Sequence, residues 1–266
     1  MKTKNEIEIA TNAAREAGIF LKQSVGAIRS IEQKEGLETN LVTDIDKRSE
    51  EMIIRRIREH FPDHGILAEE SGSTDRDAET IWVIDPLDGT TNFTHGLPIF
   101  CVSIGVMHRG ELTAGVVYDP NHDEMFTAEK GKGAWLNGNR MRVSGQSKLM
   151  SSLLVTGFPY TIRENPYNAI EHFNTFLVSS QAVRRLGSAA IDFCYVAAGR
   201  FDGFWEVSLN PWDMAGGVLI VREAGGVVTD FTGKGWKLEG KNVLATNGKI
   251  HAPMIEVLKK NLREKE

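Results

Sequence analysis

The length and composition of the chain are those of an ordinary globular protein. Its 266 residues, 41% of them apolar and 25% charged, are enough for one large or two modest hydrophobic cores, which excludes a disordered chain and a coiled coil. The formal net charge of -5 lacks the basic excess that binding to a phosphate backbone requires, so general nucleic-acid binding is not expected.

The cysteines and the apolar runs bear on the cellular compartment. Cys101 and Cys194 lie far apart inside apolar runs, without metal-ligand spacing, and are predicted to be buried, reduced thiols. Residues 1–4 lead directly into an amphipathic pattern, and no run reaches the roughly 18 apolar residues that span a bilayer. We therefore expect a cytoplasmic protein with no membrane anchor.

The first half of the chain predicts two helices that face a mostly antiparallel sheet. Apolar residues recur at helical spacing over residues 6–23 and 45–61, whereas the polar stretches 31–40 and 73–79 are predicted to be a loop and a linker. Short apolar runs bounded by turn residues predict the strands, at residues 66–68, 81–84, 99–107, 111–118, 123–130 and 133–136.

The second half alternates strands with helices. Strands are predicted at residues 153–156, 183–186, 201–207, 227–230 and 243–246. Helices are predicted at residues 166–180, 188–199, 212–224 and 253–262. This alternation is typical of an α/β layer, and we place a domain boundary near residues 146–152. The N-terminal half, residues 1–148, is then α+β and holds most of the candidate metal ligands; the C-terminal half, residues 149–266, is α/β.

The strongest chemical signal follows the predicted strand at residues 81–84. Asp85 and Asp88 flank a Pro-Leu pair and are followed by Gly89 and Thr90. Two carboxylates on one tight turn suit Mg²⁺, which prefers oxygen ligands and shares them with substrate phosphate, and the glycine lets the backbone approach a ligand closely. Taken alone, the motif fits an acidic β-turn with proline at a turn position equally well.

Three further acidic residues fit the same site. Glu69 ends a predicted strand close in sequence to the one that ends at Asp85, so the two acids are expected at the ends of neighbouring strands. Asp46 lies in the first turn of the second predicted helix, and Asp213 lies in the first turn of a later one. Each of these two is explained either by a favourable interaction with the helix dipole or by a role as a metal or water ligand.

Together these segments resemble the paired signatures of the inositol monophosphatase family. The resemblance covers nearly the whole chain, in order, and two long signatures together are highly specific. It rests on Asp85-Pro86-Leu87-Asp88-Gly89-Thr90-Thr91-Asn92-Phe93 and Trp212-Asp213-Met214-Ala215-Gly216, supported by Glu69-Glu70-Ser71, Asn40-Leu41-Val42-Thr43 before Asp46, Gly187-Ser188-Ala189-Ala190 and Glu223-Ala224-Gly225-Gly226.

The resemblance implies a fold, an activity and a cofactor. The implied fold is a mixed α/β, layered αβαβα sandwich of the inositol monophosphatase and fructose-1,6-bisphosphatase type, and the implied assembly is a homodimer. The implied activity is hydrolysis of a phosphate monoester that depends on Mg²⁺, with about two to three ions per site, and that lithium inhibits. The implied ligands are Glu69, Asp85 and the Leu87 carbonyl for the first ion, Asp85, Asp88 and Asp213 for the second, and Glu69 and Asp46, through waters, for a weaker third.

The same resemblance implies the residues that meet the substrate. The backbone amides of Gly89 and Thr90 would bind the phosphate. In the implied mechanism a metal-activated water, oriented by Glu69 and Thr90 with help from Asp46, attacks phosphorus directly and no covalent intermediate forms. The implied substrate-binding residues are Gly89, Thr90, Ala189, Glu206 and Asp213.

The preferred substrate stays open at this stage. Thr91-Asn92-Phe93 and Glu206 resemble the inositol monophosphatase branch, so inositol 1-phosphate is the first expectation, within the class of small phosphorylated polyols and sugars. Fructose 1,6-bisphosphate, alone or as a second substrate, is the alternative within enzymes. The alternative from another class is a protein that contacts the transcription machinery; its candidate surfaces are the basic pair Arg184-Arg185 and residues 55–58, which a solvated helix or a dimer surface explains equally well.

Overall fold

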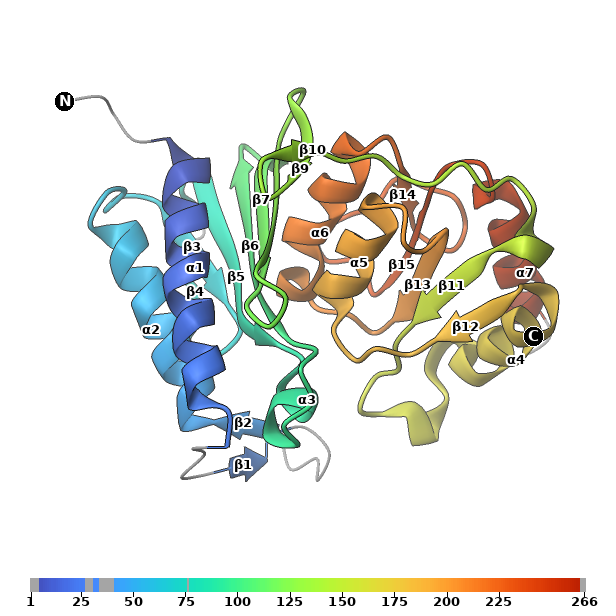
Figure 1. Cartoon of the computed structure of the whole chain (residues 1–266), viewed down its shortest axis with the longest axis horizontal. Coiled ribbons are helices and arrows are strands. Elements are labelled where there is room, and N and C mark those ends of the chain that lie inside the picture. The colour runs from blue at the N-terminus through green and yellow to red at the C-terminus, as the bar shows by residue number, and fades with distance from the viewer. Residues whose placement is uncertain (1–4, 27–30, 34–40, 76, 264–266) are drawn as a thin grey trace.

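The protein is a five-layer stack of helices and sheets. The computed structural model describes residues 5–26, 31–33, 41–75 and 77–263, and Figure 1 shows the layers side by side. Helices α1 and α2 cover the outer face of one sheet, α5 and α6 lie between the two sheets, and α4 and α7 cover the outer face of the other. Their bounds are α1 Glu6–Ser24, α2 Asp44–Arg58, α4 Ala169–Ser179, α5 Ala189–Ala197, α6 Pro211–Glu223 and α7 His251–Arg263. The αβαβα expectation is confirmed.

The first sheet has eight strands in the order β10-β9-β8-β7-β6-β5-β3-β4. Every neighbouring pair is antiparallel except β3 and β5, which run parallel. This confirms the predicted sheet and the two helices that face it. Its strands are β3 Gly65–Ala68, β4 Gly72–Thr74, β5 Thr80–Asp88, β6 Cys101–His108, β7 Glu111–Asp119, β8 Glu124–Glu129, β9 Gly133–Leu136 and β10 Asn139–Arg140.

Two polar stretches contain strands that the sequence did not predict. β1 (Ile31–Gln33) falls in the predicted loop and pairs with β2 (Leu41–Thr43), whereas residues 34–40 lie outside the described residues. β4 falls partly in the predicted linker and pairs with β3. Each of these two strands is only three residues long, which is too short for alternation of apolar residues to reveal it.

The second sheet has five strands in the order β12-β11-β13-β15-β14. The strands β12, β11 and β13 are parallel to each other, and β15 and β14 pair antiparallel at the other side. The predicted helix over residues 166–180 instead begins with a 3₁₀ turn at Pro166–Asn168, because Tyr167 and Asn168 have φ of 52° and 56°, in the left-handed region. The strand bounds are β11 Leu153–Thr156, β12 Ala182–Arg184, β13 Gly203–Val207, β14 Val227–Thr229 and β15 Asn242–Thr246.

Small residues let α6 approach the first sheet closely. A Cβ at Gly105 on β6 would lie 2.6 Å from the Ala215 Cβ, and one at Gly115 on β7 would lie 2.6 Å from the Gly216 carbonyl oxygen. Larger side chains at these four positions would push the helix off the sheet. The Ala-Gly-Gly run in α6 therefore serves close packing.

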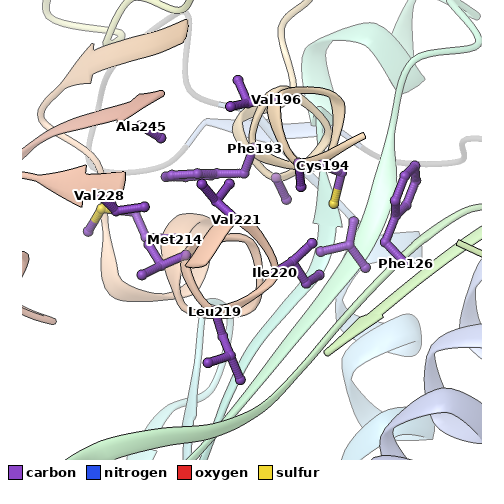
Figure 2. Packing of buried hydrophobic residues seen from close by; sticks show 14 of the residues in the cluster. Phe126, Phe193, Cys194, Val196, Met214, Leu219, Ile220, Val221, Val228 and Ala245 are labelled. Atoms are coloured by element: carbon purple, nitrogen blue, oxygen red, sulfur yellow. The ribbon is translucent and has the colours of Figure 1, made fainter. Parts of the chain in front are cut away.

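The hydrophobic core continues across the middle layer into both halves of the chain. Figure 2 shows side chains of α5 and α6 packed between residues of the two sheets. Cys101 and Cys194 are both buried and unpaired, as predicted. Helices α5 and α6 belong to the second half but pack against the first sheet, so one core spans both halves. The division at residue 148 stays a prediction. In the part of the chain that the structure describes, no helix has the length and apolarity needed to cross a bilayer. The labelled core residues are Phe126, Phe193, Cys194, Val196, Met214, Leu219, Ile220, Val221, Val228 and Ala245.

Candidate active site

The Asp-Pro-Leu-Asp motif forms an irregular end to β5. Asp85 lies opposite Ser103 on β6 and Asp88 lies opposite Cys101, so three steps along β5 match two steps along β6. This is the geometry of a β-bulge, which accommodates the proline that cannot donate to the ladder. The strand therefore continues to Asp88, whereas the sequence had predicted that it ends before Asp85.

The acids that end neighbouring strands lie at one edge of the sheet, as predicted. β3 runs parallel to β5, and Glu69 follows the last residue of β3. The Glu69 amide donates to the Ile84 carbonyl oxygen at 3.2 Å, which places Glu69 beside the start of the bulge. The parallel pair thus brings two acidic segments of the sequence to one place.

Backbone donors orient three of the carboxylates. One oxygen of Asp85 accepts from the Leu87 amide at 3.0 Å, and one oxygen of Asp213 accepts from the Asn210 amide at 2.7 Å. Asp88 is held more firmly, since its Oδ2 accepts from the Ser188 hydroxyl at 2.6 Å and from the Ala190 amide at 2.7 Å. Each carboxylate keeps a second oxygen that is not used in these bonds.

These residues line one cavity of about 180 Å³. Of the predicted site residues only Asp46 is not part of the cavity wall; it lies fully buried behind it, and its Oδ1 accepts from the Thr90 hydroxyl at 3.1 Å. The Thr90 hydroxyl also lies 3.1 Å from the Leu87 carbonyl oxygen. The predicted residues that the cavity brings together are Glu69, Asp85, Leu87, Asp88, Gly89, Thr90, Ala189, Glu206 and Asp213.

The electrostatics of the cavity favour a cation. Burial raises the pKa of Asp85 well above its ordinary value, and the charges of Glu69, Asp88 and Asp213 raise it further. Burial likewise raises the pKa of Asp88 and of Asp213. Carboxylates that repel one another in a desolvated site are stabilised in their charged form by a cation that replaces the missing solvent.

The donor set fits Mg²⁺ with an incomplete protein shell. Among the residues that the structure describes, no three carboxylate, imidazole or thiol side chains stand close enough to form a complete metal centre on their own. Mg²⁺ is usually held by one or two carboxylates together with waters and substrate phosphate, and seldom by a dedicated cage of protein ligands. The cavity offers oxygen donors of this kind on several sides, from Glu69, Asp85, Asp88 and Asp213.

Glycine is required at position 89, between the bulge and a short helix. Gly89 has a φ of 99°, and a Cβ there would lie 2.9 Å from the Ile99 carbonyl oxygen. The residue precedes the short helix α3 (Thr90–Thr94). Any other side chain would be strained in this conformation and would also clash with backbone.

Sequence reasoning did not assign a role to several residues at the site. Ser188 holds Asp88 and, as the N-cap of α5, also accepts from the Ile191 amide at 3.4 Å. Arg185 and Tyr160 line the cavity from the second half of the chain. A serine before an apolar helix is a recognisable capping signal, but its contact with a carboxylate 100 residues away has no sequence signature.

Comparison with known proteins decides the family. The family model described as the inositol monophosphatase family matches residues 2–263. The chain belongs to the inositol monophosphatase family. Membership supports phosphatase activity on a phosphorylated substrate, and the family is generally metal-dependent.

Individual members of the inositol monophosphatase family resemble the chain over nearly its full length. It is 46% identical to an inositol-1-monophosphatase of a Synechocystis species, covering 95% of this chain and 88% of the relative, and 42% identical to the Nus factor SuhB of Pseudomonas aeruginosa, covering 96% of each. The solved structure of an Anabaena inositol monophosphatase superposes with a TM-score of 0.84 at 44% identity, covering 96% of this chain and 95% of the other.

Proposed function

We propose that the protein is an inositol-1-monophosphatase that hydrolyses inositol 1-phosphate to inositol and phosphate. The observation that carries this proposal is the single cavity in which four acids, Glu69, Asp85, Asp88 and Asp213, face the Gly89-Thr90 segment. Uncatalysed hydrolysis of a phosphate monoester is so slow that the site must lower the barrier by ~20 kcal/mol or more. Acids that bind cations and backbone amides that bind phosphate oxygens, gathered around one small cavity, suit that task.

Mg²⁺ would supply the positive charge that neutralises the ester and lowers the pKa of a bound water. We propose that Glu69, Asp85 and the Leu87 carbonyl would hold a first ion and that Asp85, Asp88 and Asp213 would hold a second. Asp46 would contribute through water. Two to three such ions are the number that the family resemblance implies.

The residues of the chain would position the reactants for direct attack. The Gly89 and Thr90 amides would bind the phosphate oxygens, and Glu69 and Thr90 would orient a water in line with the leaving alcohol. The Thr90 hydroxyl shares its single proton between Asp46 Oδ1 and the Leu87 carbonyl oxygen, each 3.1 Å away, so both acceptors hold it in place. Glu206 and Ala189 would line the alcohol side of the pocket, since both belong to the part of the cavity that the second half supplies, and Glu206 could accept from a substrate hydroxyl.

Phosphate release by the purified protein tests this proposal. With Mg²⁺ present, we expect kcat/KM for inositol 1-phosphate to exceed that for fructose 1,6-bisphosphate, phosphoadenosine phosphate and NADP. We expect Asp88→Asn to lower it by at least about 10³-fold, since a charged oxygen that faces the site is lost. The matched control is Asp63→Asn, an exposed acid far from the cavity. Near-full activity of Asp88→Asn would contradict the proposed site.

One observation supports fructose 1,6-bisphosphate as a second substrate. Arg185 lines the cavity on the side of Glu206, and its guanidinium opposes the rise in the pKa of that glutamate. A cation in this position could pair with a second phosphate group. Equal or higher kcat/KM for fructose 1,6-bisphosphate, lost on Arg185→Ala, would place the protein among enzymes with dual specificity.

We also propose that two copies of the chain form a homodimer through α4 and the edge strand β12. The outer face of α4 exposes three apolar side chains, with Ile170 43%, Leu177 51% and Val178 75% exposed. Among the strands that the structure describes, β12 pairs with β11 alone, so its other edge offers hydrogen-bonding groups to a partner strand. We expect a dimer in light scattering and a monomer for Leu177→Asp with Val178→Asp; a monomeric wild type would exclude this assembly.

A role in contacting the transcription machinery is the alternative from another class. Its support is that several relatives are named Nus factors, among them SuhB of Escherichia coli, which is 44% identical. The basic residues 55–58 are partly engaged within the chain, since Arg56 pairs with Glu16 at 2.7 Å and Arg58 with Asp75 at 2.9 Å. A pull-down with RNA polymerase, repeated with Asp85→Asn, would separate this role from catalysis.

A further inference from the structure

One face of α2 carries three buried polar side chains. Asp46, Ser49 and Glu50 are 0%, 0% and 3% exposed, and their spacing of three and four places them on the same side of the helix. Buried polar groups cost free energy unless they are hydrogen-bonded, so each of these side chains needs a hydrogen-bond partner. We call these residues the polar face of α2.

Each residue of the polar face holds a different segment of the proposed active site. Asp46 accepts from the hydroxyl of Thr90, in the phosphate-binding segment, at 3.1 Å. Ser49 donates to the carbonyl oxygen of Pro86, between the two aspartates of the bulge, at 2.8 Å. Glu50 accepts from backbone amides in the turn that follows Glu69.

Of the three residues, Glu50 makes the contact with the most hydrogen bonds. Its Oε2 accepts from the Glu70 amide at 2.8 Å and its Oε1 from the Ser71 amide at 2.8 Å. Both carboxylate oxygens are therefore committed to two successive backbone donors of one turn. Without Glu50 these donors would lose these acceptors, because the β3–β4 ladder ends at the Ala68–Gly72 pair and leaves Glu70 and Ser71 in the turn.

These bonds fix the backbone on both sides of Glu69. A peptide unit is rigid, so a hydrogen bond to its N–H or its carbonyl sets the orientation of the whole plane. The plane before Glu69 is fixed by its own amide, which donates to the Ile84 carbonyl oxygen at 3.2 Å. The plane after Glu69 contains the Glu70 amide, which Glu50 receives. With both planes held, the direction in which the Glu69 side chain leaves the chain is determined.

We propose that Glu50 is a positioning residue of the active site, which aims the Glu69 carboxylate into the cavity without touching metal or substrate. Ser49 assists by holding the Pro86 carbonyl in the bulge. The proposal rests on the proposed function for the use of Glu69, but the geometry that it assigns to Glu50 is independent of which substrate is hydrolysed.

Amide exchange in the metal-free protein tests this geometry without any substrate. We expect the Glu70 and Ser71 amides of the wild type to be protected, although the Ser71 residue is exposed to solvent. In Glu50→Gln, one oxygen becomes a donor that faces an amide donor, and we expect exchange at these two amides to rise by about 10-fold or more. Rapid exchange of both amides in the wild type would overturn the proposal.

Mg²⁺ affinity, measured by calorimetry, tests the consequence for Glu69. Loss of a group that orients a ligand typically weakens metal binding by about 10- to 100-fold, and we expect Glu50→Gln to weaken Mg²⁺ binding within this range. The apparent KM for Mg²⁺ should rise with it, while kcat at saturating Mg²⁺ should change less. The matched control is Glu51→Gln, which removes the neighbouring, exposed carboxylate of α2 and should leave affinity and exchange unchanged.

A second substitution keeps the test decisive if Glu50→Gln does not fold. Glu50→Asp retains the charge but is one methylene shorter, so it cannot reach both amides, and we expect the same two changes at smaller size. Unchanged amide exchange and unchanged Mg²⁺ affinity in a folded Glu50 variant would overturn the proposal. If Mg²⁺ affinity and exchange respond as expected while no phosphate ester is hydrolysed, the role of Glu50 stands and the proposed function fails.

Discussion

The two halves of the chain bring their acids to the cavity in different ways. Glu69, Asp85 and Asp88 come from neighbouring strands of one sheet, and hydrogen bonds within that half or to the start of α5 set their directions. Asp213 comes with α6, whose place depends on small residues packed against β6 and β7. Glu69 and Asp85 are therefore fixed by backbone geometry within their own sheet, and Asp213 is fixed by how a helix docks on a sheet.

This difference indicates which acids of the site a distant substitution can displace. A change far from the cavity can move Asp213 if it alters the packing of α6, whereas Glu69 and Asp85 are tied to their own sheet. Asp88 is intermediate, since donors at the start of α5 also hold it. Asn92 links the two arrangements, because its side-chain amide donates to the Ile99 carbonyl in the first half at 2.8 Å and to the Leu186 carbonyl in the second at 2.9 Å.

The largest effect is expected from forcing α6 away from the first sheet. In Gly105→Val the new side chain would collide with Ala215, since even a Cβ would lie 2.6 Å from the Ala215 Cβ. We expect a loss of about 3 kcal/mol in the free energy of unfolding, measured with urea, and a fall in kcat/KM because Asp213 moves with α6. Gly235→Val is the control, since nothing lies within 4 Å of its Cβ position. A loss under about 1 kcal/mol would show that docking of α6 tolerates the change.

Mg²⁺ should stabilise the protein, and more so as the pH rises. The pKa of Asp85 is raised in the folded state, so without metal its contribution to stability is complete below the ordinary pKa of about 4 and is lost as the pH rises toward the folded value. Mg²⁺ at 100 times its Kd should add about 2.7 kcal/mol.

The melting temperature as a function of pH checks this, with EDTA and with Mg²⁺. Asp85→Asn lacks the titrating group, so the stability of the metal-free wild type relative to this variant should fall as the pH rises. The opposite slope would mean that the buried carboxylates are already compensated within the protein.

The smallest effect is expected where a single hydroxyl joins the halves. Ser188→Ala removes the donor that lies 2.6 Å from Asp88 Oδ2 but leaves the Ala190 amide in place. We expect about a 10-fold loss in Mg²⁺ affinity or activity, with little change in folding. Ser179→Ala, whose hydroxyl bonds only to its own helix, is the control for the loss of a serine. Equal behaviour of the two variants would remove Ser188 from the site.

The amino-acid sequence by itself determined most of the helices and strands and the acids, whereas the order of the five layers followed from the family resemblance. Helical and strand periodicity gave α1, α2 and the sheets, because a buried face must repeat at the spacing of its element. The pairing of Glu69 with Asp85 followed from two strands that end in carboxylates. Residue type and spacing carry this information without reference to distant contacts.

Only the tertiary structure decided what holds these acids in place. The bulge at Pro86, the amides received by Glu50 and the hydroxyl of Ser188 all join segments that lie far apart in the sequence. A glutamate on an amphipathic helix has the same local sequence pattern whether its carboxylate accepts from the amides of a turn or faces solvent. Such contacts depend on how elements meet, which periodicity within one element does not encode.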